Sequence, residues 1–198
     1  SQAAVAAHAV PILERGTDLV ALSVGALRDP ALLERVRTAA TAGESLLRVP
    51  SGAVVGLDGL AALSPSGITN VTLTGYRPPA MLGPYVDDLE AVAEHESGTT
   101  VFEGSGAAAA EAFPAHMNIA MAVALAADVD PDAVGVRLVL DHDAPRSRYV
   151  VEASGPAADL TCEVENTTTP TAGDATHLVI DATLATLERL AAPIAVGT

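Results

Sequence analysis

Two short turns in the first third of the sequence combine serine and glycine directly after apolar runs. Residues 22–27 (LSVGAL) and 49–53 (VPSGA) each close such a run. Glycine lets a backbone approach a flat ring, and exposed N–H groups can bind a carboxamide or a carboxylate. Ligands of open α/β sheets bind beyond the carboxyl ends of the strands, where both turns are expected. The pattern therefore predicts one binding site made of both turns, although ordinary tight turns would read the same way.

Polar side chains later in the sequence give less specific signals. Asn118 lies in an alanine-rich helical stretch and needs a hydrogen-bond partner if it is buried, either a ligand or a second side chain. In the segment 146–149 (RSRY), Ser147 and Tyr149 would face one side of a strand and the two arginines the other. The five histidines show no metal-ligand spacing, and one cysteine builds neither a disulfide nor a thiolate metal site within a chain. We expect no metal and a reducing, cytoplasmic location.

Composition narrows the class of protein. The 198 residues are 49% hydrophobic but only 3% aromatic, and the formal net charge is −15. A surface of this charge repels phosphate backbones and anionic lipids, so neither nucleic acid nor a membrane is an expected partner. The longest apolar stretch, 107–127, contains Glu111, Pro114, His116 and Asn118, which favours a buried helix over a membrane span.

Periodicity and capping signals predict the elements that would position these residues. Helices are expected at 2–15, 30–42, 57–63, 107–127 with a bend at Pro114, and 175–190. Buried strands at 19–24 and 46–49 alternate with helices, which predicts a parallel sheet. Strands at 71–74, 101–104, 134–140, 149–153 and 160–165 follow, the last three as an antiparallel, one-sided sheet, with a surface excursion over 80–100.

The predicted fold is therefore α/β in two parts. Residues 1–68 form the C-terminal part of a Rossmann-like dinucleotide-binding domain, and residues 69–198 form an α+β domain with a mixed or antiparallel sheet. No GxGxxG turn occurs in the sequence, so a pyrophosphate-binding half either lies outside this chain or never existed.

Three stretches in this order resemble the aspartate dehydrogenase family: 22–27, 49–53 and 113–120 (FPAHMNIA). Weaker matches occur at 77–79, 102–104 and 165–166, so the resemblance covers nearly the whole chain. It implies NAD or NADP as cofactor, an amino or imino acid as substrate, and a homodimer. The cofactor-binding residues that it implies are Ser23, Gly25, Ala26, Ser51, Gly52, Ala53 and Asn118.

The departures from the family pattern fall on its catalytic motifs. Tyr149 stands where the family has its catalytic histidine, and Ser147 stands where it has an asparagine. His116 also replaces an asparagine, and residues 172–176 (AGDAT) replace a stretch with an asparagine and a lysine. We therefore expect Tyr149 as the catalytic residue, acting as an acid unless it only packs. Ser147, His116 and Thr176 are the expected substrate contacts.

These observations favour an NAD(P)-dependent amino-acid dehydrogenase or imine reductase with diverged specificity. Two alternatives remain: a non-catalytic homologue that serves as a binding or assembly module, and one half of a split dehydrogenase.

Overall fold

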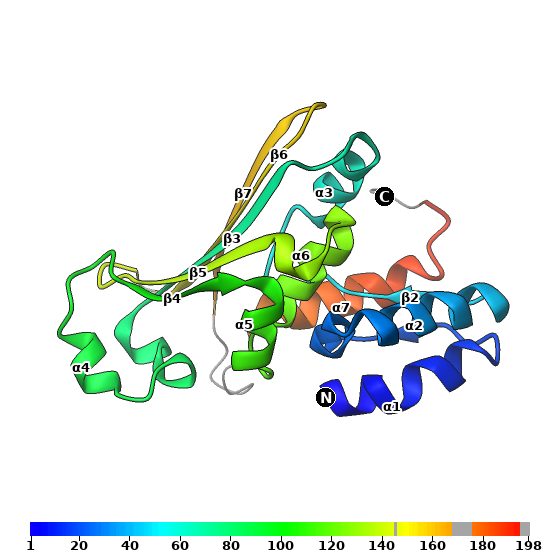
Figure 1. Cartoon of the computed structure of the whole chain (residues 1–198), viewed down its shortest axis with the longest axis horizontal. Coiled ribbons are helices and arrows are strands. Elements are labelled where there is room, and N and C mark those ends of the chain that lie inside the picture. Colours follow the sequence, from blue (N-terminus) through cyan, green and yellow to red (C-terminus); the bar gives the residue numbers. More distant parts are fainter. Residues whose placement is uncertain (145, 168–175, 195–198) are drawn as a thin grey trace.

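The computed structural model describes residues 1–144, 146–167 and 176–194. Figure 1 shows two regions: a small layer of helices and short strands near the N-terminus, and a long twisted sheet with helices on one face. This is the α/β architecture with a small parallel sheet and a larger mixed sheet that the sequence predicts. None of the described helices is long and apolar enough to cross a membrane.

The N-terminal region contains α1 (Gln2–Leu13), β1 (Leu19–Val20), η1 (Val24–Arg28), α2 (Pro30–Ala42) and β2 (Leu47–Arg48). β1 and β2 pair in parallel, as predicted. α2 begins as its local signals require, because the Asp29 carboxylate accepts from the N–H of Ala31 and Pro30 occupies the first turn. The strand predicted at 19–24 is shorter, because the chain turns into η1 at Val24 and buries Val24 and Leu27.

The larger sheet has the strand order β4-β5-β3-β6-β7. Its strands are β3 (Asn70–Arg77), β4 (Thr100–Ser105), β5 (Val134–Leu140), β6 (Ser147–Ser154) and β7 (Asp159–Asn166). The antiparallel pairing predicted among the strands of 134–165 is wrong in one respect, whereas the mixed sheet that was the other expectation for residues 69–198 is confirmed. β3 lies between β5 and β6 and runs parallel to β5, since a long crossover joins β3 to β5.

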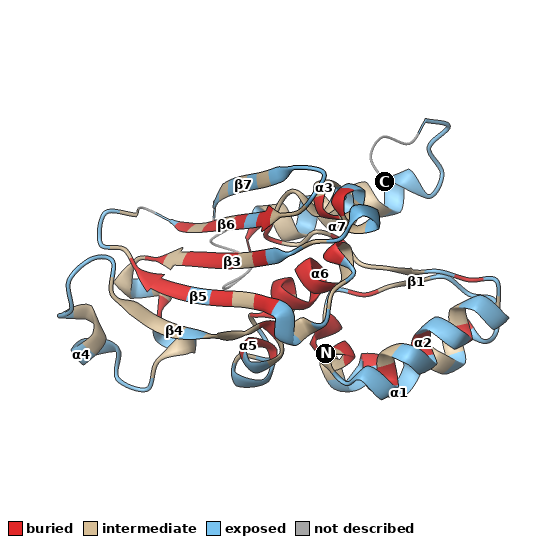
Figure 2. Cartoon of the chain, turned by 45° about the horizontal axis from the view of Figure 1, so that its top comes forward, coloured by how far each residue is buried: buried red, intermediate tan, exposed pale blue. Residues whose placement is uncertain are grey.

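The helix predicted over 107–127 is two helices, α5 (Gly106–Ala112) and α6 (Asn118–Ala127). Pro114 has no N–H to donate and cannot continue α5, so the chain breaks rather than bends there. The turn between the helices closes when the N–H groups of His116 and Met117 donate to the carbonyl of Phe113. Figure 2 shows α6 buried beneath the sheet.

The helix pair α5 and α6 joins the two regions. Ala109 and Ala120 belong to the core under the large sheet, whereas Ala110 and Met121 belong to the core under α1, α2 and η1. α3 (Leu57–Leu63) packs on α6 and is followed by η2 (Ser64–Ser66). The division of the chain near residue 68 stays a prediction.

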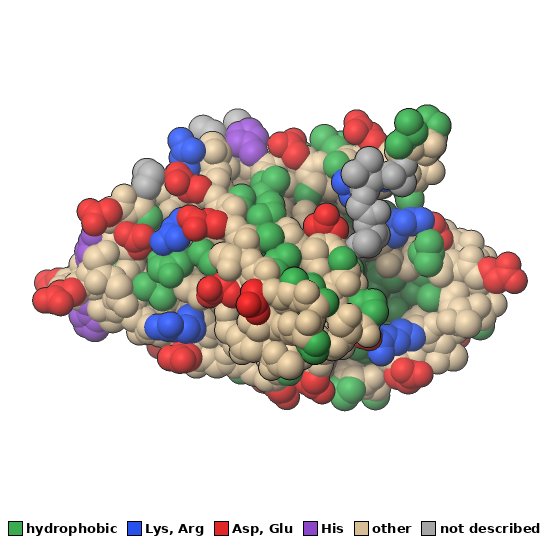
Figure 3. All heavy atoms as spheres, turned by 90° about the horizontal axis from the view of Figure 1, so that it is seen from above, with side chains coloured by type: hydrophobic (Ala, Val, Ile, Leu, Met, Phe, Trp, Pro, Cys, Tyr) green, Lys and Arg blue, Asp and Glu red, His purple; other side chains and the backbone are tan. Residues whose placement is uncertain are grey.

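The remaining elements are short helices between the strands of the large sheet and one longer helix near the end of the chain. The excursion after β3 carries η3 (Pro79–Met81), η4 (Gly83–Tyr85) and α4 (Leu89–Ala93). η5 (Pro131–Ala133) precedes β5, and α7 (His177–Arg189) follows the undescribed residues 168–175. Acidic side chains are spread over the face seen in Figure 3.

Candidate functional site

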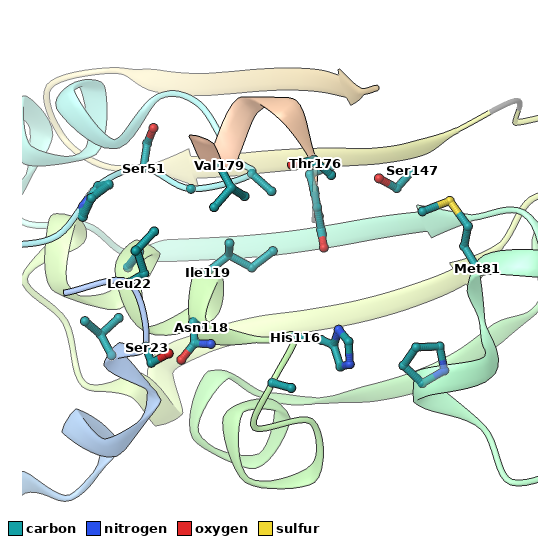
Figure 4. A pocket seen from close by; sticks show the side chains of 18 of the residues that line it. Leu22, Ser23, Ser51, Met81, His116, Asn118, Ile119, Ser147, Thr176 and Val179 are labelled. Carbon is teal, nitrogen blue, oxygen red and sulfur yellow. The ribbon is translucent and has the colours of Figure 1, made fainter. Parts of the chain in front are cut away.

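A cavity of about 430 Å³ lies where the two regions meet. Figure 4 shows Leu22, Ser23 and Ser51 near one end, Ser147 and Met81 near the other, and Ile119 between them. The volume is within the range of small-molecule sites. The described lining residues are Leu22, Ser23, Val24, Val49, Pro50, Ser51, Gly52, Ala53, Arg77, Ala80, Met81, Pro84, Tyr85, Ala115, His116, Asn118, Ile119, Ala122, Ser147, Tyr149, Thr176 and Val179.

One end of the cavity is made of the two turns that follow β1 and β2. Because the strands are parallel neighbours, Ser23 and the segment 50–53 emerge at the same edge. Gly52 has a φ of +65°, a left-handed conformation that favours glycine. This end presents backbone and small side chains without a charge, which suits an uncharged ring better than a phosphate.

Two asparagines from the other region hold these turns. The N–H of Gly25 donates to Asn118 Oδ1 at 3.0 Å, so the partner that Asn118 requires is the backbone of η1. Asn166 Nδ2 donates to the carbonyl of Ala53 at 2.9 Å. Both bonds join segments about a hundred residues apart in the sequence, and they fix the turns against α6 and β7.

The structure separates the predicted cofactor residues into two groups. Ser23, Ser51, Gly52, Ala53 and Asn118 line the cavity. Gly25 and Ala26 do not line the cavity, because they lie within η1, behind the cavity wall. A Cβ added to Gly25 would meet the side chain of Gln2 there.

The opposite end is made of side chains from the large sheet. Ser147 and Tyr149 on β6 are buried and face the cavity, as alternation predicts. Arg148 lies on the other face, with its Cζ 3.8 Å from the ring centroid of Tyr76. Arg146 is exposed and pairs with Glu165 at 3.9 Å, so neither arginine of this segment lines the cavity.

Arg77, at the end of β3, is a lining residue that the sequence interpretation assigned no role. It is 3% exposed, and its Nη2 donates to the hydroxyl of Tyr149. Its Cζ lies 4.3 Å from the ring centroid of Tyr149 and 5.7 Å from that of Tyr85. Gly75, which pairs with Tyr149 across the strands, leaves room for that ring, because an added Cβ would lie 3.1 Å from it.

The aromatic neighbours set the electrostatics of this end. Burial acts to lower the pKa of Arg77, but its contacts with the Tyr149 and Tyr85 hydroxyls outweigh this, and the net shift of that pKa is upward. Burial raises the pKa of Tyr85 to about 12. Arg77 is therefore a permanent cation, and Tyr85 beside it keeps its proton at neutral pH.

His116 and Thr176 complete this wall. The His116 ring meets Tyr85 edge to face, with centroids 5.5 Å apart, and Tyr85 also contacts Phe113. Thr176 is buried, and its hydroxyl has no hydrogen-bond partner within the described residues. Residues 172–175, the rest of the diverged family stretch that ends at Thr176, lie outside the described residues. No cluster of metal-ligating side chains occurs in the part of the chain that the structure describes.

Sequence reasoning missed Arg77, Tyr85 and Asn166. Arg77 entered only through the weak family match at 77–79, although it continues the inward-facing positions of β3 after Val71, Leu73 and Gly75. A polar residue at an inward position of an alternating strand is the signal that could have found both Arg77 and Asn166. Tyr85 carries no such signal, because it comes from an irregular excursion.

Comparison with known proteins agrees with this geometry. Residues 58–190 match the family model "Aspartate dehydrogenase, C-terminal", and residues 1–50 match "Homoserine dehydrogenase, NAD binding domain". An L-aspartate dehydrogenase of Methanosarcina barkeri is 34% identical over the whole chain and 74% of its own length. L-aspartate dehydrogenase 1 of Bordetella pertussis is 39% identical over 82% of the chain and 61% of its own length.

A solved structure gives the same result. The aspartate dehydrogenase of Thermotoga maritima superimposes with a TM-score of 0.83 and 26% identity, over all of this chain and 75% of that one. The chain therefore belongs to the aspartate dehydrogenase family.

Proposed function

We propose that the chain is an NAD(P)-dependent amino-acid dehydrogenase or imine reductase whose specificity differs from that of its relatives. The observation that carries the proposal is the arrangement of the cavity. Two uncharged backbone turns face a buried Arg77–Tyr149 pair across it. A nicotinamide ring suits the first end, and the carboxylate and nitrogen of an amino or imino acid suit the second.

The residues of the first end fit the nicotinamide half of the cofactor. Ser51, Gly52 and Ala53 offer backbone to the carboxamide, and Asn118 stands beside them with its oxygen already bonded to Gly25. When bound, the nicotinamide would accept a hydride from the α-carbon of an amine or give one to an imine. The sequence offers no Gly-rich turn for the pyrophosphate, so this chain alone should bind NAD and NADP weakly.

The residues of the second end have roles that follow from their bonds. Because Arg77 donates to the Tyr149 oxygen, the Tyr149 hydroxyl keeps its own proton to donate, and a substrate nitrogen or carbonyl oxygen would accept it in place of the neighbouring Tyr85. Tyr149 would donate that hydrogen bond, and Ser147 beside it would help to orient the same group. A phenol does not titrate near neutrality as histidine does, so we expect reduction to be favoured over the hydration step of oxidation.

A binding or assembly module without chemistry is the less favoured alternative. An assembly module has no need for a buried cation next to a phenol inside a cavity, because packed apolar side chains in their place would cost the folded state less free energy. The family membership points the same way.

Three expectations from the sequence remain part of this proposal. They are a homodimer, a cytoplasmic location and a domain division near residue 68. The face of the large sheet that carries Thr72, Arg137 and Glu152 lies opposite α5 and α6 and offers a surface for a second copy. Light scattering at micromolar concentration should give twice the mass of one chain, and a monomer mass would remove the dimer from the proposal.

The catalytic proposal is tested by a reduction assay on the full chain. NADH and NADPH are supplied separately with a 2-oxo acid and ammonium, and the amino acid that forms is measured by chromatography. We expect product with at least one cofactor at high concentration. A third reaction receives reduced nicotinamide mononucleotide in place of the dinucleotide. If no amino acid forms in any of the three reactions, the proposal is contradicted.

A further inference from the structure

The substrate end of the cavity contains one permanent cation. Arg77 is the only charged side chain that is buried in the described part of the chain. The sequence contains no lysine, and all ten arginines lie within the described residues. Among the described residues that line the cavity, Arg77 is the single arginine, and no aspartate or glutamate joins it there.

Arg77 also has no counter-ion of its own within the described residues. The ion pairs of that part of the chain involve Arg37, Arg48, Arg146 and Arg148. Arg77 instead donates from Nη1 to the carbonyl of Tyr76 and from Nη2 to Tyr149, and its guanidinium also hydrogen-bonds the hydroxyl of Tyr85. A guanidinium carries five N–H donors in a planar fork, so donors remain for a ligand. Burying this cation is costly unless an anion joins it, and a carboxylate matches the fork.

A second carboxylate would find no comparable partner. Apart from Arg77, the polar side chains on the described wall are hydroxyls, the Asn118 amide and the ring of His116. The ring of His116 is engaged edge to face with Tyr85.

From these contacts we infer that the cavity holds a single carboxylate, on Arg77, and takes an amino or 2-oxo acid whose side chain is small and uncharged. The inference rests on the proposed function for the identity of the substrate's reacting group. It goes beyond that function by choosing monocarboxylates over the aspartate of the relatives. Apolar lining groups such as Met81, Ile119 and Val179 are the surfaces left for an uncharged side chain.

The test compares two stable ligands of four carbons that differ only at the last group. L-2-aminobutanoate ends in a methyl, and L-aspartate ends in a carboxylate. Each is titrated calorimetrically into the full chain, without cofactor and then with reduced nicotinamide mononucleotide. We expect 2-aminobutanoate to bind at least about tenfold more tightly, because an unmatched carboxylate loses its hydration without a partner. Equal binding, or tighter binding of aspartate, would overturn the inference.

Variants assign the preference to Arg77. We expect Arg77→Gln to weaken 2-aminobutanoate binding at least about tenfold and Arg77→Lys to weaken it less, since lysine keeps the charge but not the fork. Arg137→Gln is the matched control, because Arg137 is exposed on β5 and bonds Thr100 away from the cavity. Unchanged binding in folded Arg77→Gln and Arg77→Lys would overturn the role of Arg77. If Arg77→Gln does not fold, ligand binding by Arg77→Lys and the wild-type preference between the two ligands still test the inference.

The result is separable from that of the proposed function. Tight 2-aminobutanoate binding without hydride transfer would contradict the dehydrogenase and leave the single-carboxylate site standing. Hydride transfer together with a preference for aspartate would support the dehydrogenase and contradict the single-carboxylate site.

Discussion

The two ends of the cavity are built in different ways. The end assigned to the cofactor consists of backbone turns at residues 22–24 and 50–53, which Asn118 and Asn166 hold in place from the other region. The end assigned to the substrate consists of side chains, chiefly Arg77, Tyr149 and Ser147 on the large sheet. Backbone contacts survive most substitutions, whereas side-chain contacts change with each one. The first end can therefore stay constant within a family while the second alters the substrate.

Replacement of Tyr149 should give the largest effect and confine it to the substrate end. Tyr149→Phe removes the hydroxyl that would donate to the substrate, and we expect the rate of imine reduction to fall about 100-fold. The affinity for reduced nicotinamide mononucleotide should change less than about threefold, because Tyr149 lies at the other end. Steady-state kinetics and a fluorescence titration measure the two quantities. An equal loss in both would remove the division between the ends.

Replacement of Asn118 should affect the cofactor end of the cavity instead of the substrate end. Asn118→Leu leaves the N–H of Gly25 without an acceptor, and we expect about tenfold weaker binding of the reduced mononucleotide. Asn118→Asp is the informative partner, because it keeps an acceptor oxygen for Gly25 but loses the amide N–H₂. Wild-type affinity in Asn118→Asp means that Asn118 acts by holding the turn. A loss as large as that of Asn118→Leu would mean that the amide itself contacts the cofactor.

Asn166 should contribute to stability as well as to the position of the second turn. Asn166→Ala removes the donor to the Ala53 carbonyl at a site where the side chain is 1% exposed. We expect the free energy of unfolding in urea to fall by about 1–2 kcal/mol. Asn70→Ala, at an exposed position of β3, is the control and should change it by less than about 0.5 kcal/mol. A loss of stability with unaltered mononucleotide binding would show that Asn166 does not position the turn.

The smallest expected effect is the pH dependence of Tyr85. Burial raises its pKa in the folded protein to about 12, above the ordinary value near 10. The folded state therefore keeps a proton that the unfolded state loses, and the associated stability is present below pH 10 and declines as pH rises toward 12. The loss should be roughly 1 kcal/mol by about pH 11. Urea midpoints of the wild type and Tyr85→Phe measure it, and parallel alkaline declines in both would exclude Tyr85 as the source.

Local signals predicted the elements better than they predicted the pairing between them. The start of α2 was readable because Asp29 and Pro30 determine it within four residues. The break between α5 and α6 was seen only as a bend, because the sequence does not show how the chain leaves Pro114. The insertion of β3 between β5 and β6 depends on contacts between distant residues, and hydrophobic periodicity contains no information on them.

The candidate site shows the same division. Alternation along β6 placed Ser147 and Tyr149 on the cavity side, and the predicted parallel pairing of the first two strands placed both turns at one edge. The role of Asn118 could not be read, because its partner is a backbone N–H 93 positions away. Arg77 escaped notice because its contacts come from β6 and from the irregular excursion that carries Tyr85.

Isotope transfer determines whether a nicotinamide and an amino or imino acid meet in this cavity. The full chain is given reduced nicotinamide mononucleotide or NADH carrying deuterium at the transferable position of the ring, together with 2-oxobutanoate and ammonium. Mass spectrometry of the 2-aminobutanoate should find one deuterium at the α-carbon, with its rate of appearance reduced in Tyr149→Phe and in Asn118→Leu. Product without deuterium, or no product above a protein-free control, would contradict the account.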